Sequence, residues 1–209
     1  MKKILILLFS IFFIGSPSVF ADDISDFSVE GISIGDSLLD YMTEEEILKE
    51  IEISLSLNSY DFLNEPFKYL EVYSYKDFPT YDRISFMIKN NYTNQYVTNN
   101  NEKYTIVYIA GHIDYPEDFD SCIQKRNEIV EVLSKMFSNA QKKEHFYKSN
   151  HDPSEKSIVD EVSFDFDSGN IIGTYCTNYD ETFRIKNNIE EGLTVQIKLK
   201  EIYTWLDDY

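Results

Sequence analysis

Two cysteines, Cys122 and Cys176, are the residues whose chemistry is easiest to read from the sequence. Cys122 falls on the apolar face of a predicted helix, and Cys176 falls on a predicted strand. In an oxidising compartment the two thiols can form a disulfide that joins this helix to the sheet. The disulfide would close a loop of more than 50 residues, which would stabilise the fold by about 3–4 kcal/mol. The alternative is a pair of buried free thiols that pack as small apolar side chains.

The three histidines are His112, His145 and His151, and none has the paired spacing of a zinc-binding helix. His112 and Asp114 fall on the same face of a predicted strand end, where they could share a metal ion. A solvated strand terminus explains the same two residues. We therefore predict no metal site.

The segment Asp165–Asn170 begins like a calcium-binding loop, with oxygen-bearing side chains near a glycine. A complete loop needs a glutamate at its twelfth position, and that position holds Cys176. Asp, Ser, Gly and Asn are also the residues that favour tight turns. The segment is therefore predicted to be the turn of a β-hairpin.

Motifs for known catalytic machinery are missing from the sequence. It contains no G-x-S-x-G elbow, no glycine-rich phosphate loop and no H-E-x-x-H helix. Acidic residues are too numerous for a pair of catalytic carboxylates to be recognised. We predict no catalytic residue and no cofactor, and the ligand-binding residues stay unknown at this stage.

The charge of the chain narrows the classes of partner. Its 209 residues include 37 Asp and Glu against 19 Lys and Arg, which gives a formal net charge of −18. Nucleic acid and anionic membrane surfaces would be repelled rather than neutralised by such a chain. An apolar content of 43% is sufficient for a packed core and excludes a fully disordered chain. Cationic partners, metal cations or solubility alone are compatible with the charge.

The first 21 residues have the layout of a secretory signal peptide. Lys2 and Lys3 precede the apolar run Ile4–Ile14, and small residues allow cleavage after Ala21. The apolar run is shorter than the roughly 20 residues that span a bilayer. We therefore expect a periplasmic or secreted protein that does not span the membrane after cleavage, with residues 22–209 as its single domain.

Hydrophobic periodicity predicts two helices and seven strands. Thr43–Glu46 has the pattern of a capping box and begins a helix that ends near residue 53. The longest apolar helical stripe covers Asp118–Asn139, and Lys142 and Lys143 are interpreted as its basic C-terminal extension. The expected strands are Phe27–Ile34, Phe67–Tyr75, Arg83–Lys89, Tyr104–Ile113, Ile158–Phe166, Ile171–Thr177 and Leu193–Leu199.

The sequence also predicts the structure of three further segments. Asn90–Lys103, rich in Asn and Tyr, is predicted to be a long hairpin loop, and Asn178–Glu191 to be polar and irregular. Ile202–Leu206 is predicted to form a terminal helical turn that docks Trp205. The order of elements indicates an α+β fold, with an antiparallel β-sheet and one long and one shorter helix packed on one face.

The N-terminal part of the predicted domain carries a resemblance. Phe27–Leu39, followed by Thr43–Ile47, resembles the opening of uncharacterised secreted or periplasmic proteins of marine alphaproteobacteria, a group without an assigned activity. Ile34–Ser37 is similar to the turn before the first helix of the BamE/SmpA outer-membrane assembly lipoproteins. Those proteins have a lipidated cysteine and place helices before the sheet, so their function is not transferred.

Export, acidity and the missing motifs together favour a monomeric, non-catalytic binding or interaction protein of the cell envelope. A small-ligand or cation-binding periplasmic protein is the first alternative, with Asn90–Lys103 as a candidate binding segment. A hydrolase without a recognisable motif is the second alternative. The expected partner is an envelope protein or a small ligand.

Overall fold

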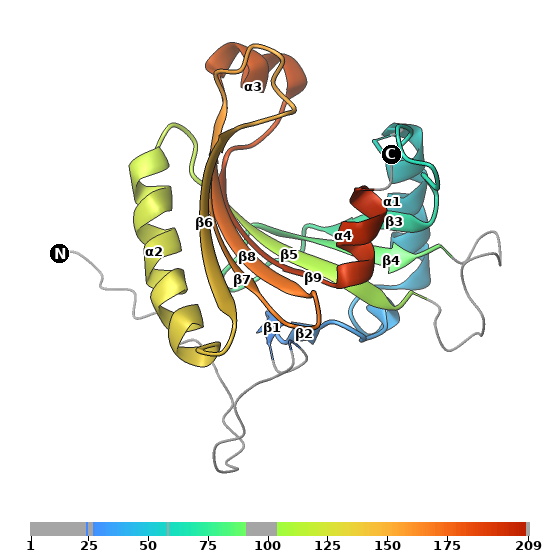
Figure 1. Cartoon of the computed structure of the whole chain (residues 1–209). Helices are drawn as coiled ribbons and strands as arrows, with labels where there is room; N and C mark the ends of the chain where they lie inside the picture. Colours follow the sequence, from blue (N-terminus) through green and yellow to red (C-terminus); the bar gives the residue numbers. More distant parts are fainter. Residues whose placement is uncertain (1–23, 25–26, 58, 91–103, 208–209) are drawn as a thin grey trace.

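The computed structural model describes residues 24, 27–57, 59–90 and 104–207. In this part of the chain, seven strands form one antiparallel sheet that is strongly curved (Figure 1). From one edge to the other the strands are β3 (Tyr69–Ser74), β4 (Arg83–Lys89), β5 (Ile106–Asp114), β9 (Gly192–Lys198), β8 (Ile171–Asn178), β7 (Ile158–Asp165) and β6 (Gln141–Lys148).

Four α-helices accompany the sheet in the described residues: α1 (Glu44–Leu57), α2 (Phe119–Met136), α3 (Glu181–Asn187) and α4 (Lys200–Leu206). The predicted α+β class with an antiparallel sheet is confirmed. The structure adds α3 to the expected helices, and α4 corresponds to the predicted terminal helical turn at Ile202–Leu206. No helix in the described ranges combines the length and the hydropathy that a membrane-crossing segment needs.

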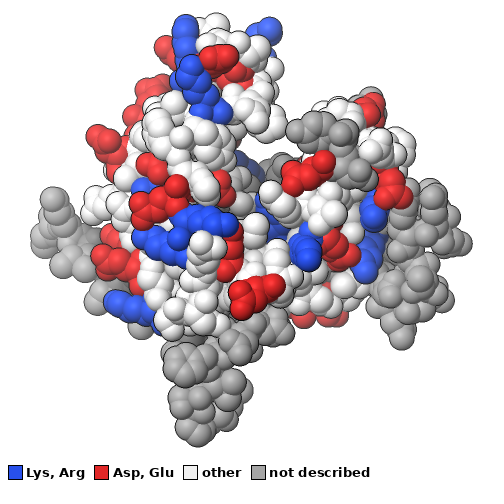
Figure 2. All heavy atoms as spheres, in the orientation of Figure 1, with Lys and Arg blue, Asp and Glu red and all other residues white. Residues whose placement is uncertain are grey.

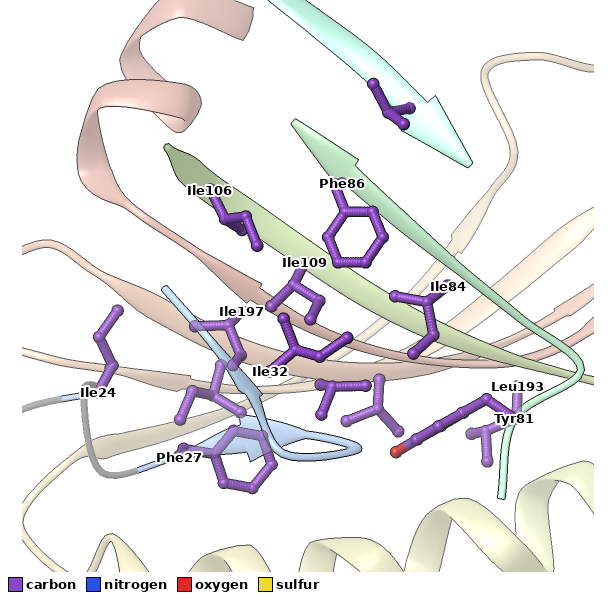
Figure 3. Close-up of a cluster of buried hydrophobic side chains, with 14 of the residues drawn as sticks. Ile24, Phe27, Ile32, Tyr81, Ile84, Phe86, Ile106, Ile109, Leu193 and Ile197 are labelled. Atoms are coloured by element: carbon purple, nitrogen blue, oxygen red, sulfur yellow. The ribbon is translucent and has the colours of Figure 1, made fainter. Parts of the chain in front are cut away.

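The main core lies between the convex face of the sheet and the helices α1 and α2. Alternate residues of each strand point into it because successive side chains of a strand face opposite sides. Ile84 and Phe86 of β4 and Ile197 of β9 are fully buried there (Figure 3). The capping box predicted at the start of α1 is present, because the amide of Thr43 donates to Oε2 of Glu46 at 2.7 Å and the Glu46 amide donates back.

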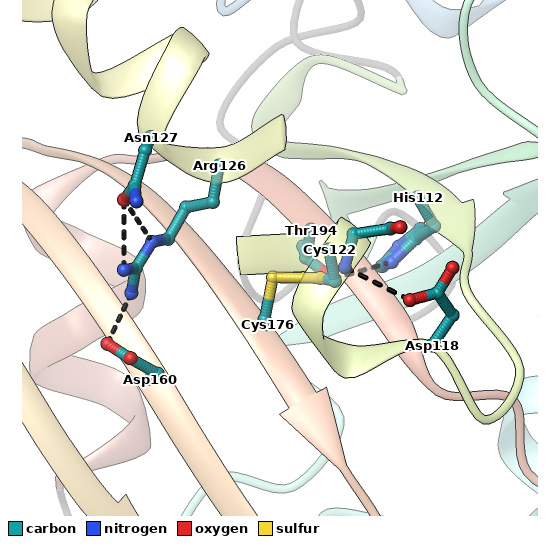
Figure 4. Close-up of a disulfide and its surroundings, with 9 residues drawn as sticks. His112, Asp118, Cys122, Arg126, Asn127, Asp160, Cys176 and Thr194 are labelled. Atoms are coloured by element: carbon teal, nitrogen blue, oxygen red, sulfur yellow. Dashed lines mark hydrogen bonds and ion pairs between the residues drawn. A yellow bond between two sulfur atoms is a disulfide. The ribbon is translucent and has the colours of Figure 1, made fainter. Parts of the chain in front are cut away.

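A disulfide joins Cys122 of α2 to Cys176 of β8, as predicted, and both residues are fully buried (Figure 4). The alternative of two free thiols is therefore wrong. One helical turn further along, the buried guanidinium of Arg126 contacts Asp160 of β7. A covalent bond and an ion pair thus both attach α2 to the convex side of the sheet.

The last helix, α4, packs on the opposite side of the sheet, so the helices do not all lie on one face. Ile202 and Trp205 form a small second core with Tyr69, Met87 and Val107. The indole Nε1 of Trp205 donates to the carbonyl oxygen of Glu65 at 2.8 Å. The predicted docking of Trp205 by a terminal helix is confirmed.

The region predicted as one strand at Phe27–Ile34 is a small hairpin outside the main sheet. Its strands are β1 (Ser28–Val29) and β2 (Ile32–Ser33). Glu30 and Gly31 between them both have positive φ values, of 55° and 78°. Two consecutive residues with positive φ form the tight turn that reverses a β-hairpin.

Two elements were missed because neither has an apolar periodicity. Lys142 and Lys143 belong to the edge strand β6, whose residues are almost all exposed, and do not extend α2. The segment expected to be irregular contains α3, which buries none of its residues. The side chain of Asp180 caps this helix by accepting from the Phe183 amide, and Asn188 ends it with a left-handed conformation.

Two sequence predictions lie outside the described residues. The signal peptide Met1–Ala21 is one, and the loop Asn90–Lys103, apart from Asn90, is the other. Both stay predictions.

Candidate functional site

The concave face of the sheet is the candidate site, because polar side chains and tyrosines line it where the convex face is apolar. The strand register places them in two rows across the sheet. The His112 row consists of Arg83, His112, Thr194, Tyr175, Glu161 and His145. The Gln196 row consists of Tyr73, Ser85, Ala110, Gln196, Gly173, Ser163 and Lys143. Directly opposed side chains on neighbouring strands are close enough to interact, so each row can act as one surface.

Hydrogen bonds hold the centre of the His112 row in place. Nε2 of His112 lies 3.0 Å from Oγ of Ser85, and Nδ1 lies 3.0 Å from Oγ1 of Thr194. The Thr194 side chain is also hydrogen-bonded to Tyr175. Burial, together with the charge of Arg83, lowers the pKa of His112 to about 4. The imidazole is therefore neutral at physiological pH.

The Ser85–His112 contact has the distance of a nucleophile and its general base, but its surroundings do not suit that role. Ser85 is only 2% exposed, so a substrate carbonyl cannot approach its hydroxyl. The second nitrogen of His112 faces the Thr194 hydroxyl instead of an orienting carboxylate. The contact orders the sheet face and does not assemble a catalytic triad.

His112 and Asp114, which the sequence analysis considered as possible metal ligands, line one hollow but bind different partners. The Asp114 carboxylate accepts from the guanidinium of Arg83, which extends from the neighbouring strand. Both nitrogens of His112 are occupied by hydroxyl groups. Within the described ranges, no group of three or more His, Cys, Asp or Glu side chains could hold a metal ion.

This first hollow measures about 140 Å³ and lies at the end of the concave face nearest α3. Tyr175, Tyr179 and Glu190 contribute to its wall. Burial raises the pKa of Tyr175 to about 12, so its hydroxyl stays protonated and can donate a hydrogen bond. The hollow therefore presents neutral polar groups and the Glu190 side chain beside the Arg83–Asp114 pair.

A cluster around Glu71 lies toward the β3 edge of the same face. The Glu71 carboxylate accepts from the hydroxyl of Tyr73 at 3.0 Å and from that of Tyr60 at 3.3 Å. Burial raises the pKa of Glu71 above its ordinary value, and the two hydrogen bonds oppose this shift. The neighbouring Tyr108 donates to Oε1 of Gln196 at 3.2 Å, which links the cluster to the centre of the sheet.

A second and larger hollow, of about 740 Å³, opens over β6, β7, β8 and β9. Figure 2 shows a recess between the surfaces formed by α3 and α4, with Lys and Arg atoms visible in its depth. Ser163 and Gln196 line the hollow, and the register places Gly173 between them on β8. Gly173 is buried, and the side chains of Gln196 and Glu161 lie over the position that a Cβ would take there.

The polar groups of the larger hollow are partly paired with one another. Asp165 accepts from Nζ of Lys143 at 2.5 Å and from Oγ of Ser163 at 2.8 Å. Glu161 accepts from the Tyr147 hydroxyl at 3.1 Å. These pairs fix side chains of β6 and β7 at this end of the sheet.

Of these residues, only His112 and Asp114 were singled out as possible ligands in the sequence analysis. The strand alternation at Leu193–Leu199 was the available signal for Gln196 and Lys198, because it predicts that both face away from the core. The segment Asp165–Asn170 proved to be the β7–β8 hairpin turn, in which the Gly169 amide donates to the Phe166 carbonyl at 2.8 Å. The predicted turn is confirmed.

The fold and the site together define an α+β protein with a curved antiparallel sheet and a polar, open concave face. No protein-family model, no curated protein and no solved structure matches the chain.

Proposed function

We propose that the chain is an exported, non-catalytic binding protein that holds a small polar ligand against the concave face of its sheet. The observation that carries this proposal is the larger hollow over β6–β9, whose volume of about 740 Å³ lies within the range of small-molecule sites. Its floor and walls belong to a rigid sheet, so the hollow exists before a ligand arrives.

Fixed polar groups support a binding role. Each hydrogen bond within the rows, such as that from Ser163 to Asp165, restricts a side chain that a ligand would otherwise have to order. Ordering side chains on binding costs about 0.5–1.5 kcal/mol for each flexible group. A ligand that binds to groups already ordered does not incur this cost, so more of the free energy of its contacts contributes to affinity and selectivity.

The Ser85–His112 contact is the arrangement in the two rows that resembles catalytic machinery. Its features nevertheless support the non-catalytic part of the proposal. Its serine is inaccessible and its histidine lacks a carboxylate partner in the described residues. Nothing else in the two rows pairs a reachable nucleophile with a base.

Gly173 provides the test, because a large side chain there would displace Gln196 and Glu161, which line the hollow. A Cβ at this position would lie 3.0 Å from Nε2 of Gln196 and 3.4 Å from Oε1 of Glu161, both ends of flexible side chains. Gly173→Phe is therefore expected to fold and to block the site. Val132→Phe, which places the same ring on the outside of α2, is the matched control.

The measurement is native mass spectrometry of the purified chain after incubation with a library of small metabolites. We expect one or more bound masses on the wild type and on Val132→Phe, and their loss from Gly173→Phe. Absence of any bound mass, or the same bound masses on all three proteins, would contradict the proposal.

Export and a protein partner in the cell envelope stay predictions from the sequence. They are compatible with the buried disulfide, since an oxidising compartment is where such bonds persist. Fractionation of the native cell, with the mature N-terminus read by mass spectrometry, tests cleavage after Ala21.

A further inference from the structure

Lys198 of β9 is a cationic group that lines the larger hollow of the concave face. Its ammonium group makes no hydrogen bond or ion pair with the described residues, and its nearest recorded contact is the ring of Tyr203, with Nζ 5.9 Å from the ring centroid. The side chain is half-buried beside the larger hollow. Burial lowers its pKa, while the charges of Glu161 and Asp207 oppose that shift.

Some of the other charged groups that line this hollow are engaged within the protein. Lys143 is paired with Asp165, and Glu161 accepts a hydrogen bond from Tyr147. The side chain of Lys200 passes over the hairpin turn, where its Cδ lies 2.7 Å from the position that a Gly169 Cβ would take.

A second unused donor lies beside Lys198. Gln196, two residues earlier on the same strand, uses its Oε1 to accept from Tyr108, and its Nε2 donates to none of the described residues. Residues two apart on a strand face the same side of the sheet. Lys198 and Gln196 therefore direct two donors, one charged and one neutral, to the same hollow.

We infer that the ligand carries a compact oxyanion, a carboxylate or a phosphate, which binds between Nζ of Lys198 and Nε2 of Gln196. This inference rests on the proposed function and specifies which part of the ligand the hollow recognises. An oxyanion accepts hydrogen bonds from both donors, and a bond from an ammonium to an anionic oxygen is stronger than a neutral one. The rest of the molecule would lie over Gly173 and the Gln196 row.

The net charge of −18 does not prevent such binding. Exposed charges farther away than about 8 Å are largely screened at physiological ionic strength, so the groups that line the hollow decide the outcome. Lys143, Lys198 and Lys200 equal Glu161, Asp165 and Asp167 in number along this lining, so we expect an oxyanion to bind at the Lys198 side of the hollow.

Isothermal titration calorimetry on the purified chain tests the inference, with succinate, inorganic phosphate and glucose as probes at constant ionic strength. We expect saturable binding of succinate or phosphate and none of glucose. The comparison between succinate and phosphate distinguishes the two sources of the oxyanion.

Lys198→Met retains most of the apolar stem and removes the charge. It should weaken oxyanion binding by about tenfold or more, which corresponds to the loss of one charge-assisted hydrogen bond. Lys198→Arg should retain binding, and Lys135→Met on α2 should bind as the wild type does. Circular dichroism and the fluorescence of Trp205 check that each variant is folded.

Equal binding by Lys198→Met and the wild type, binding of glucose alone, or no binding of either oxyanion would overturn the inference. These outcomes are distinguishable from failure of the proposed function. If the wild type bound a neutral metabolite and Gly173→Phe did not, the concave face would be a ligand site without an anion-binding group.

Discussion

Oγ of Ser85 and Nε2 of His112 lie 3.0 Å apart on adjacent strands, and the other imidazole nitrogen lies at the same distance from the hydroxyl of Thr194. The ring is thus held by two hydroxyl groups, with the guanidinium of Arg83 nearby. Neither hydroxyl carries a charge that would compensate a protonated imidazole. The folded protein therefore favours the neutral ring.

This preference predicts a pH-dependent stability. The pKa of His112 is about 4 in the fold against an ordinary value of 6.5, so between these values the unfolded chain binds more protons. Stability is then fully present above pH 6.5, decreases as the pH falls toward 4, and loses no more from this group below that. The total effect is at most about 3 kcal/mol, because one pKa unit corresponds to about 1.4 kcal/mol.

Urea denaturation between pH 4 and pH 7 measures this effect. His112→Gln cannot be protonated and should show a smaller decrease than the wild type over this window. His151→Gln, which changes an exposed histidine, should follow the wild type. Parallel curves for the wild type and His112→Gln would show that His112 is not the group responsible.

Glu71 predicts an effect of the opposite sign. Its pKa is raised in the fold, so between the ordinary value and the raised value the folded chain binds more protons and stability falls as the pH rises. Glu71→Gln should increase the free energy of unfolding at pH 8 by on the order of 1 kcal/mol, since a buried charge is removed. At pH 3, where the carboxyl is protonated in both states, the gain should disappear. Thermal melts at the two pH values test this, with the exposed Glu131→Gln as control.

Gly111 of β5 is expected to tolerate no side chain. A Cβ at this position would lie 2.5 Å from Cδ1 and 2.7 Å from Cγ of Tyr81, whose ring is buried in the main core. Gly111→Ala should therefore destabilise the protein by about 1–3 kcal/mol, the usual cost of overpacking. Gly173→Ala on β8 meets only flexible side-chain ends and is the matched comparison. Equal urea midpoints for the two variants would contradict this account of Gly111.

The disulfide between Cys122 and Cys176 is expected to contribute about 4 kcal/mol, because it restricts a loop of 54 residues in the unfolded chain. Denaturation of Cys122→Ala/Cys176→Ala, compared with the oxidised wild type, measures this contribution. The intact mass without reduction should be lower than the dithiol mass by two hydrogens. A variant as stable as the oxidised wild type would show that the crosslink adds no stability.

Alternating apolar residues allowed most of the sheet to be predicted from sequence, as at Ile84, Phe86 and Ile88 of β4. Prediction from apolar periodicity failed for elements that bury few side chains, because burial is what produces the periodicity. In β6 (Gln141–Lys148) both faces are largely exposed, so polar residues occupy both and the period of two disappears. The same holds for α3 (Glu181–Asn187), which is defined by its caps rather than by an apolar stripe.

The candidate site was harder to predict than the fold for a different physical reason. Residues such as Arg83, Thr194 and Glu161 are far apart in the sequence and become neighbours only through strand order. Alternation predicts that their side chains point away from the core. It does not distinguish a binding face from a strand face that is merely exposed to solvent. The curvature that turns this face into a recess has no local sequence signal.

The exposed strand β6 also has a consequence for how the molecule behaves in a crowded compartment. As the last strand of the sheet, it has an outer edge at which another extended chain could add. Lys142, Lys143 and Lys148 occupy this strand, and lysines on an edge strand would be brought close together if two copies paired there. We therefore expect β6 to resist self-association into continuous sheets, so that the protein stays dispersed at high concentration.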